Sequence, residues 1–150
     1  MENPSALPFL IVDTSVVLKW FREKAEANVL EARRLRDAFL AGRCVLGAPD
    51  LLLVEVANAL TAGHRASLAE VSETITAIVE IGMRMSGLEF PALVKAIEIA
   101  SAFGVTVYDS YFLAVAIHSG GLLVTADEAF LRKIKSHRNA VSLRELRLPS

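Results

Sequence analysis

Short apolar runs alternate with longer segments of mixed polarity along the whole chain, and this alternation restricts the folds that are open to it. The runs at residues 9–12, 44–48 and 122–124 predict buried strands, with two weaker candidates at 86–90 and 141–143. Helices are expected between them, at residues 16–21, 25–41, 49–62, 68–81, 91–103, 109–118 and 127–134. Strands that alternate with helices favour a parallel sheet with helices on both faces.

The composition is that of a folded protein, and it excludes several functions. A length of 150 residues suits one domain, and 53% of the residues are apolar, which offsets the loss of chain entropy on folding. The longest apolar run, residues 111–117, is far shorter than the roughly 20 residues of a membrane-spanning helix. The net charge of −1 argues against a protein that coats nucleic acid non-specifically. Residues 1–8 form a peripheral leader without the pattern of a secretory signal, and the single Cys44 cannot form an internal disulfide, so we expect a cytoplasmic protein.

Four acidic residues are expected near the edge at which a parallel sheet binds its ligands. Asp13 directly follows the first strand, and Asp127 lies just past a later one. Asp109 opens a helix after a possible strand at 105–107, and Glu55 lies within an apolar helical segment that leans over the same edge. In open parallel sheets, ligands bind at the carboxyl ends of the strands, so we expect these four side chains to meet there.

Each acid also has a purely structural explanation. Asp13, Asp109 and Asp127 stand at helix starts, where aspartate caps free backbone N–H groups. Glu55 lies on a narrow polar face of its helix, which suits ordinary solvent as well as a groove. As a set, however, clustered carboxylates repel one another unless a cation joins them. Oxygen ligands without His or Cys favour Mg²⁺ or Mn²⁺ over Zn²⁺, and these ions promote the cleavage of phosphodiesters.

Around these acids the sequence resembles the PIN-domain ribonucleases, and most closely the VapC-type toxins of toxin–antitoxin pairs. The resemblance rests on four blocks: IVDTSVV at 11–17, PDLLLVEVANAL at 49–60, YDSYFLAVA at 108–116 and LVTAD at 123–127. Each block is weak alone, whereas all four in this order and at these separations are fairly specific. The resemblance extends from residue 9 to about residue 143.

This resemblance implies a three-layer α/β/α sandwich with a short, mainly parallel five-stranded sheet. It implies an endoribonuclease that hydrolyses RNA with a metal-bound water, and Mg²⁺ or Mn²⁺ as its cofactor. It also implies a homodimer that a small antitoxin protein neutralises by covering the acidic site. The residues that it assigns to catalysis and metal binding are Asp13, Glu55, Asp109 and Asp127, with Thr14, Ser15 and Thr125 in support.

A basic segment follows the last of these acids. Arg132, Lys133 and Lys135 are candidates for contacts to RNA phosphates near the site. The alternative is a solvent-exposed helix end, where cations also suit the helix dipole. Glu128 directly follows Asp127, and the sequence leaves open whether it shares the site, although Asp127 fits the motif better.

Two other functions compete with the ribonuclease interpretation. The first is a non-catalytic PIN-fold module that recruits RNA or protein, although a scaffold has no need of four like charges; metal affinity would separate the two. The second is a phosphatase that uses Asp13 as a covalent nucleophile. Such enzymes commonly place a second aspartate two residues further on, where this chain has Ser15.

Overall fold

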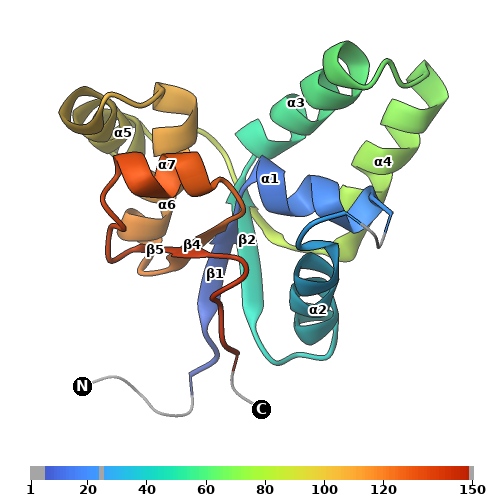
Figure 1. The fold of residues 1–150 in the computed structure, drawn as a ribbon, viewed down its shortest axis with the longest axis horizontal. Helices are drawn as coiled ribbons and strands as arrows, with labels where there is room; N and C mark the ends of the chain where they lie inside the picture. Colours follow the sequence, from blue (N-terminus) through green and yellow to red (C-terminus); the bar gives the residue numbers. More distant parts are fainter. Residues whose placement is uncertain (1–5, 24–25, 149–150) are drawn as a thin grey trace.

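The computed structural model describes residues 6–23 and 26–148, whose five strands form one parallel sheet (Figure 1). The strands lie in the order β3-β2-β1-β4-β5, and every neighbouring pair is parallel. Their bounds are β1 (Phe9–Val12), β2 (Val45–Pro49), β3 (Arg84–Ser86), β4 (Leu122–Thr125) and β5 (Ala140–Ser142). The predicted five-stranded parallel sheet is confirmed.

Helices occupy the connections between the strands. They are α1 (Thr14–Val17), η1 (Leu18–Phe21), α2 (Val29–Leu40), α3 (Leu51–Asn58), η2 (Ala59–Gly63), α4 (Leu68–Ile81), α5 (Phe90–Phe103), α6 (Val107–Ser119) and α7 (Glu128–Lys133). Figure 1 shows α1 to α4 on one side of the sheet and α5 to α7 on the other. The predicted α/β/α layers are therefore present.

The strand order explains why the helices fall into two groups. The connections from β1 to β2 and from β2 to β3 step toward one edge of the sheet, whereas the connection from β4 to β5 steps toward the other. Right-handed crossovers that step in opposite directions place their helices on opposite faces. The direction reverses between β1 and β4, so the carboxyl ends of these two strands meet at the topological switch point.

α6 is the most deeply buried helix. All residues from Ser110 to Ala116 are buried, and the helix contacts α5 as well as β1, β2 and β4. A helix that is apolar on all sides belongs in a core, and here it packs against both α5 and the central strands β1, β2 and β4. In the described parts of the chain, no helix is long and apolar enough to cross a membrane.

The strand predicted at 86–90 lies earlier in the chain, at Arg84–Ser86, and the predicted start of a helix at Pro49 is also wrong. β3 ends at Ser86, where the predicted strand begins, because its pairing with β2 runs from Gly47 to Pro49. A three-residue edge strand is too short to show an alternating pattern, so only the pairing reveals it. Pro49 closes β2 instead of opening a helix, because the backbone N–H of Asp50 donates to the carbonyl of Ser86 (2.8 Å) and extends the pairing.

Two further helices begin at positions that the sequence pattern missed. α6 starts at Val107, two residues before the predicted start, because Thr106 caps it, so the possible strand at 105–107 is absent. α2 starts at Val29, and the predicted first residue of that helix, Ala25, lies outside the described residues. Residues 1–5 of the predicted leader also lie outside them.

Candidate active site

Two of the four predicted acids lie at the switch point of the sheet. Asp13 follows β1 directly, and Asp127 follows β4 with one residue between. Val12 pairs with Val124 across the two parallel strands, so the chain leaves both strands at the same edge. This placement agrees with the expectation drawn from the sequence, because ligands of open parallel sheets bind at that edge.

Asp13 serves as the N-cap of α1 and is also the most strongly perturbed acid of the cluster. Its carboxylate accepts hydrogen bonds from the backbone N–H of Val16 (3.3 Å) and from the hydroxyl of Ser15 (2.5 Å). Burial nevertheless raises the pKa of Asp13 to about 6, and the charge of Asp109 adds to this rise. The hydrogen bonds from Ser15, Thr125 and Val16 oppose it. Asp13 can therefore cap α1 and also belong to a functional acidic cluster.

A chain of hydroxyl groups joins the two strand ends. The oxygen of Ser15 accepts a hydrogen bond from the backbone N–H of Ala126 (2.9 Å) and lies 3.3 Å from the hydroxyl of Thr125. Thr125 is fully buried, and its oxygen accepts from the backbone N–H of Asp127 (3.1 Å). These bonds hold α1 against the turn after β4.

Glu55 reaches the same region from α3. The hydroxyl of Thr14, in the first turn of α1, donates to its carboxylate at 2.7 Å. Burial raises the pKa of Glu55, the charge of Asp109 raises it further, and the hydrogen bond from Thr14 opposes both. Thr14 and Ser15 therefore orient one acid each, as expected of supporting residues.

Asp109 lies in the first turn of α6, but it is not the cap that its position in the sequence suggests. The cap is Thr106, whose hydroxyl oxygen accepts from the backbone N–H of Asp109 (3.1 Å). Thr106 was not among the predicted residues, although a threonine three residues before an acid is the pattern of a helix start. This cap occupies the backbone of Asp109 and leaves its side chain exposed to solvent.

The charge of Asp109 couples the four acids to one another. Partial burial raises the pKa of Asp109, and the charge of Asp127 raises it further, while Thr106 and Lys133 lower it. The same Asp109 charge raises the pKa values of Asp13 and Glu55. The predicted residues therefore form one electrostatic cluster, although they come from four different connections of the fold.

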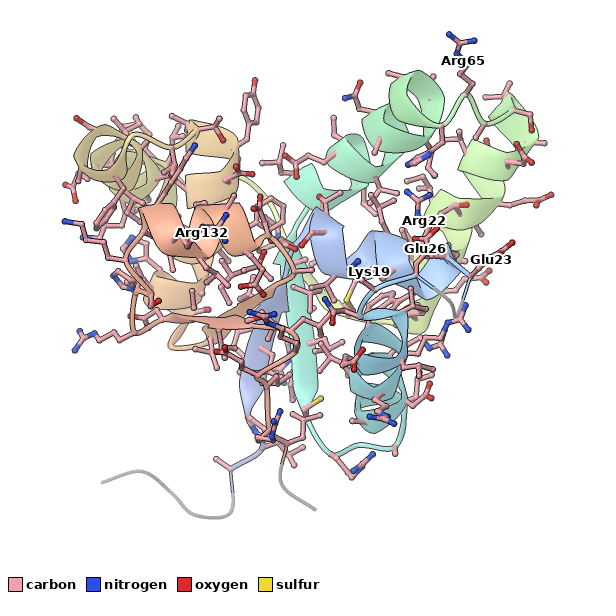
Figure 2. All side chains as sticks on the ribbon, viewed as in Figure 1. Lys19, Arg22, Glu23, Glu26, Arg65 and Arg132 are labelled. Carbon is pink, nitrogen blue, oxygen red and sulfur yellow. The ribbon has the colours of Figure 1, made fainter. Side chains whose placement is uncertain are left out.

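The three predicted phosphate-binding cations differ in position. Lys133 lines a cavity of about 350 Å³ together with Asp109 and Asp127. Arg132, which Figure 2 labels on α7, lines a separate cavity beside β5. Lys135 follows α7 as an exposed residue and lines neither cavity. Of the three, only Lys133 lines the cavity of the acids, while Arg132 and Lys135 are exposed at and just after the end of α7.

Glu128 points away from the acidic cluster. Its carboxylate accepts a hydrogen bond from the hydroxyl of Ser142 in β5 and lies 3.4 Å from the guanidinium of Arg144. Asp127, by contrast, lines the cavity of the cluster and accepts from the backbone N–H of Phe130 (2.9 Å) as the N-cap of α7. The structure thus separates the two adjacent acids, one on each side of the α7 start.

The donor set suits a hard divalent cation by its chemistry. All four acids supply oxygen ligands, and the raised pKa values of Asp13, Glu55 and Asp109 show that their ionised forms are disfavoured without a counter-charge. As their side chains are placed, no three His, Cys, Asp or Glu residues within 6–23 and 26–148 are close enough to hold one ion together. Binding would therefore require the carboxylates to turn toward a shared ion.

The perturbed Asp13 predicts a specific dependence of stability on pH. Its pKa of about 6 in the folded state exceeds its ordinary value of 3.8, so the folded state binds the proton more tightly than the unfolded state does. The associated stability is present below pH 3.8 and is lost as the pH rises to about 6, by up to about 3 kcal/mol. Urea unfolding in the presence of a chelator measures this loss at each pH.

Asp13→Asn is the matched variant for that experiment, because asparagine retains the capping oxygen but does not titrate. The difference in unfolding free energy between parent and variant should change between pH 4 and pH 6 and stay constant above. A constant difference across this range would contradict the perturbed pKa.

The comparison with protein families identifies the fold. The sequence model of the PIN domain family matches residues 10–135. No curated protein gives a significant match to the sequence.

Solved structures with the same fold cover almost the whole chain. PAE2754 from Pyrobaculum aerophilum is 24% identical, with a TM-score of 0.63 and 93% of each chain covered. A toxin–antitoxin complex from Klebsiella pneumoniae contains a chain that is 14% identical, with a TM-score of 0.67 and coverage of 91% of this chain and 99% of that one. VapC20 of Mycobacterium tuberculosis, a toxin that cleaves the sarcin–ricin loop, is 16% identical, with a TM-score of 0.63 and coverage of 82% and 93%.

Proposed function

The chain belongs to the PIN domain family, and from this premise we propose that it is a metal-dependent endoribonuclease. The observation that carries the proposal is the coupling of four acids at the edge where β1 and β4 end. Asp109 raises the pKa values of Asp13 and Glu55, and its own pKa is raised by Asp127. Such a cluster is unfavourable for a fold by itself and is explained by a cation that joins its members.

We assign the metal-ligand role to Asp13, Glu55, Asp109 and Asp127. A bound Mg²⁺ or Mn²⁺ would supply an activated water and neutralise negative charge on the oxygens of the phosphate under attack. Ser15, Thr125 and Thr14 keep the carboxylates of Asp13 and Glu55 in place through the hydrogen bonds described above.

Lys133 is suited to a different task at the same site. It lines the cavity beside Asp109 and Asp127, and its charge lowers the pKa of Asp109. A cation at this position offsets part of the acidic potential and attracts a phosphate to the site.

We further propose that the protein is the toxin of a type II toxin–antitoxin pair and acts as a homodimer. Support comes from the solved structures of the same fold, which include toxin–antitoxin complexes from Klebsiella pneumoniae and Rickettsia felis. The partner would be a small antitoxin that covers the acidic cluster, for example with an arginine that pairs with its carboxylates.

The test is cleavage of labelled RNA, structured and unstructured, in Mg²⁺, Mn²⁺ or chelator. Asp127→Asn and Glu128→Gln form a matched pair of variants, because the two acids are adjacent in the chain but face different parts of the molecule. Cleavage should require the metal, fall by about 10²-fold or more in Asp127→Asn, and persist in Glu128→Gln. Asparagine also keeps the cap of α7, so the fold is retained.

Three outcomes would count against this function. Cleavage that resists the chelator would exclude a metal-dependent reaction. Equal loss in the two variants would show that the acids beside α7 act through stability and not through the site. An absence of both cleavage and Mg²⁺ or Mn²⁺ affinity would favour the non-catalytic binding module.

A further inference from the structure

A second cavity, away from the acidic cluster, is lined by four arginines. It has a volume of about 510 Å³ and lies between α2 and the segment that follows β5. Arg34 comes from α2, Arg43 from the connection to β2, and Arg144 and Arg147 from the C-terminal segment. Four of the 16 lysines and arginines of the chain thus border one cavity, although the net charge of the protein is −1. We name it the arginine cavity.

The charge of the arginine cavity is only partly compensated. Glu31 is the one acid in its lining, and Arg144 pairs with Glu128 outside it. Within the described residues, Arg34 and Arg43 lie within 4.0 Å of no carboxylate, and both are exposed. Guanidinium groups that are exposed and unpaired attract an anion, and their planar donors match the oxygens of a phosphate.

The floor of the arginine cavity is apolar. Leu146 and Leu148 are partly exposed and supply its accessible apolar surface, whereas Leu35 and Leu143 also line it but are only 1% and 3% exposed. A leucine surface makes no favourable contact with a phosphate alone, but it can cover the face of a base or a ribose. Arginine also stacks on bases, so the lining matches both halves of a nucleotide. A volume of about 510 Å³ falls in the range of ordinary ligand pockets.

The C-terminal segment is held in a defined position against the start of α7. The guanidinium of Arg144 lies 3.4 Å from the carboxylate of Glu128, the residue that follows Asp127. The guanidinium of Arg147 donates to the carbonyl groups of Arg144 (3.3 Å) and Leu146 (3.0 Å). Arg144 therefore places one side of the arginine cavity next to Glu128, whereas Arg43 precedes β2, at the amino ends of the strands and opposite to the acids that follow β1 and β4. An RNA that contacts both places must span several nucleotides.

We propose that the arginine cavity binds one or two nucleotides of a single-stranded RNA that extends from there to the acidic cluster. This inference rests on the proposed ribonuclease function and adds a second point of contact to it. The arginines neutralise the phosphates, and the leucine floor receives the bases. The contact favours RNA with a single-stranded flank over RNA that is base-paired on both sides of the cleaved bond.

The test is the binding of fluorescein-labelled oligouridine RNA, measured by fluorescence anisotropy in a chelator, so that no strand is cut. The parent is compared with the Arg34→Ala/Arg43→Ala double variant, whose substituted residues are exposed and outside every ion pair described. Arg65→Ala is the control, because Figure 2 places this exposed arginine beyond η2, far from α2. We use a 12-nucleotide and a 4-nucleotide RNA at several salt concentrations.

The parent should bind the 12-nucleotide RNA more tightly than the 4-nucleotide RNA, and the double variant should lose about tenfold in affinity for the longer one. The slope of log affinity against log salt should fall by about 1.4, since each lost contact to a single strand removes about 0.7. The control should match the parent. Unchanged affinity and slope in the double variant would overturn the proposal.

A competition experiment identifies what the cavity prefers. The dinucleotide UpU and inorganic triphosphate are each added to the complex of the parent with the longer RNA. UpU carries less negative charge than triphosphate. If UpU displaces the RNA at a lower concentration than this difference in charge would allow, contacts to the base are supported. Displacement governed by charge alone would overturn the assignment to nucleotides. Because these measurements need no cleavage, a protein that binds but does not cut refutes the proposed function and not the arginine cavity.

Discussion

Replacing Asp109 by asparagine is expected to lower metal-dependent RNA cleavage by a factor of about 10³ while the fold is retained. Asp109 is the acid whose charge acts on Asp13 and Glu55 and whose own pKa responds to Asp127. Asparagine has nearly the same shape but no charge, so the cluster loses the member that couples it. The cap of α6 uses only the backbone N–H of Asp109, which the substitution leaves in place.

The stability of Asp109→Asn is a second measurement, and it should not fall with the activity. The raised pKa of Asp109 means that its ionised form is disfavoured in the folded protein. In a chelator at neutral pH, Asp109→Asn should therefore have a Tm equal to that of the parent or slightly higher. Added Mn²⁺ should raise the Tm of the parent more than that of the variant, because a ligand that binds only the folded state stabilises it.

Asp50→Asn is the matched control for both measurements. Asp50 is an exposed aspartate that precedes α3 and makes no side-chain cap bond. It should retain cleavage and the full response of Tm to Mn²⁺. Full cleavage by Asp109→Asn would place the active site elsewhere, and a lowered Tm in chelator would show that Asp109 is a structural residue.

The largest effect on stability is expected from Phe112→Ala, which should lower the free energy of unfolding by about 3–5 kcal/mol. Phe112 is 1% exposed and lies in the middle of α6, the helix that contacts β1, β2 and β4. Removing the ring leaves a cavity that a rigid helix between two layers cannot close. A loss of this size is a large part of the 5–15 kcal/mol that holds an ordinary domain together.

Urea unfolding measures this change, with Ile97→Ala as the control. Ile97 lies on the neighbouring helix α5 but is 52% exposed, so its truncation should cost less than about 1 kcal/mol. A loss below about 1 kcal/mol for Phe112→Ala would mean that α6 repacks readily and does not hold Asp109 in a fixed position.

The sequence pattern predicted the elements that have a strong local signal. β1, β2 and β4 are apolar runs of four or five residues in the interior of the sheet, and they appear where the pattern places them. β3 was displaced because a three-residue edge strand has no periodicity of its own and exists through its pairing with β2. Pro49 was assigned to the wrong element for the same reason, since the same bond network holds it.

The candidate site shows the same division. Asp13 and Asp127 could be predicted from the strands that precede them, because strand ends of a parallel sheet share an edge. Glu55 and Asp109 depend on how α3 and α6 are packed, and Asp109 proved to follow the cap of its helix instead of forming it. No local pattern distinguishes Lys133 from Arg132, because adjacent residues of a helix face different directions and only the packing of α7 decides which of them lines the cavity of the acids.

Local chemistry and periodicity thus determined the fold class and the order of the layers, and they pointed to Asp13 and Asp127 as candidate site residues, because each of these depends on residues that are neighbours in the chain. Only the tertiary structure decided which side chains share a charge environment and which cations stand beside the acids. It alone brought Arg34 and Arg43 to the same cavity as Arg144 and Arg147, about a hundred residues further along the chain. Such contacts are set by the packing of distant elements, which no pattern along the sequence records.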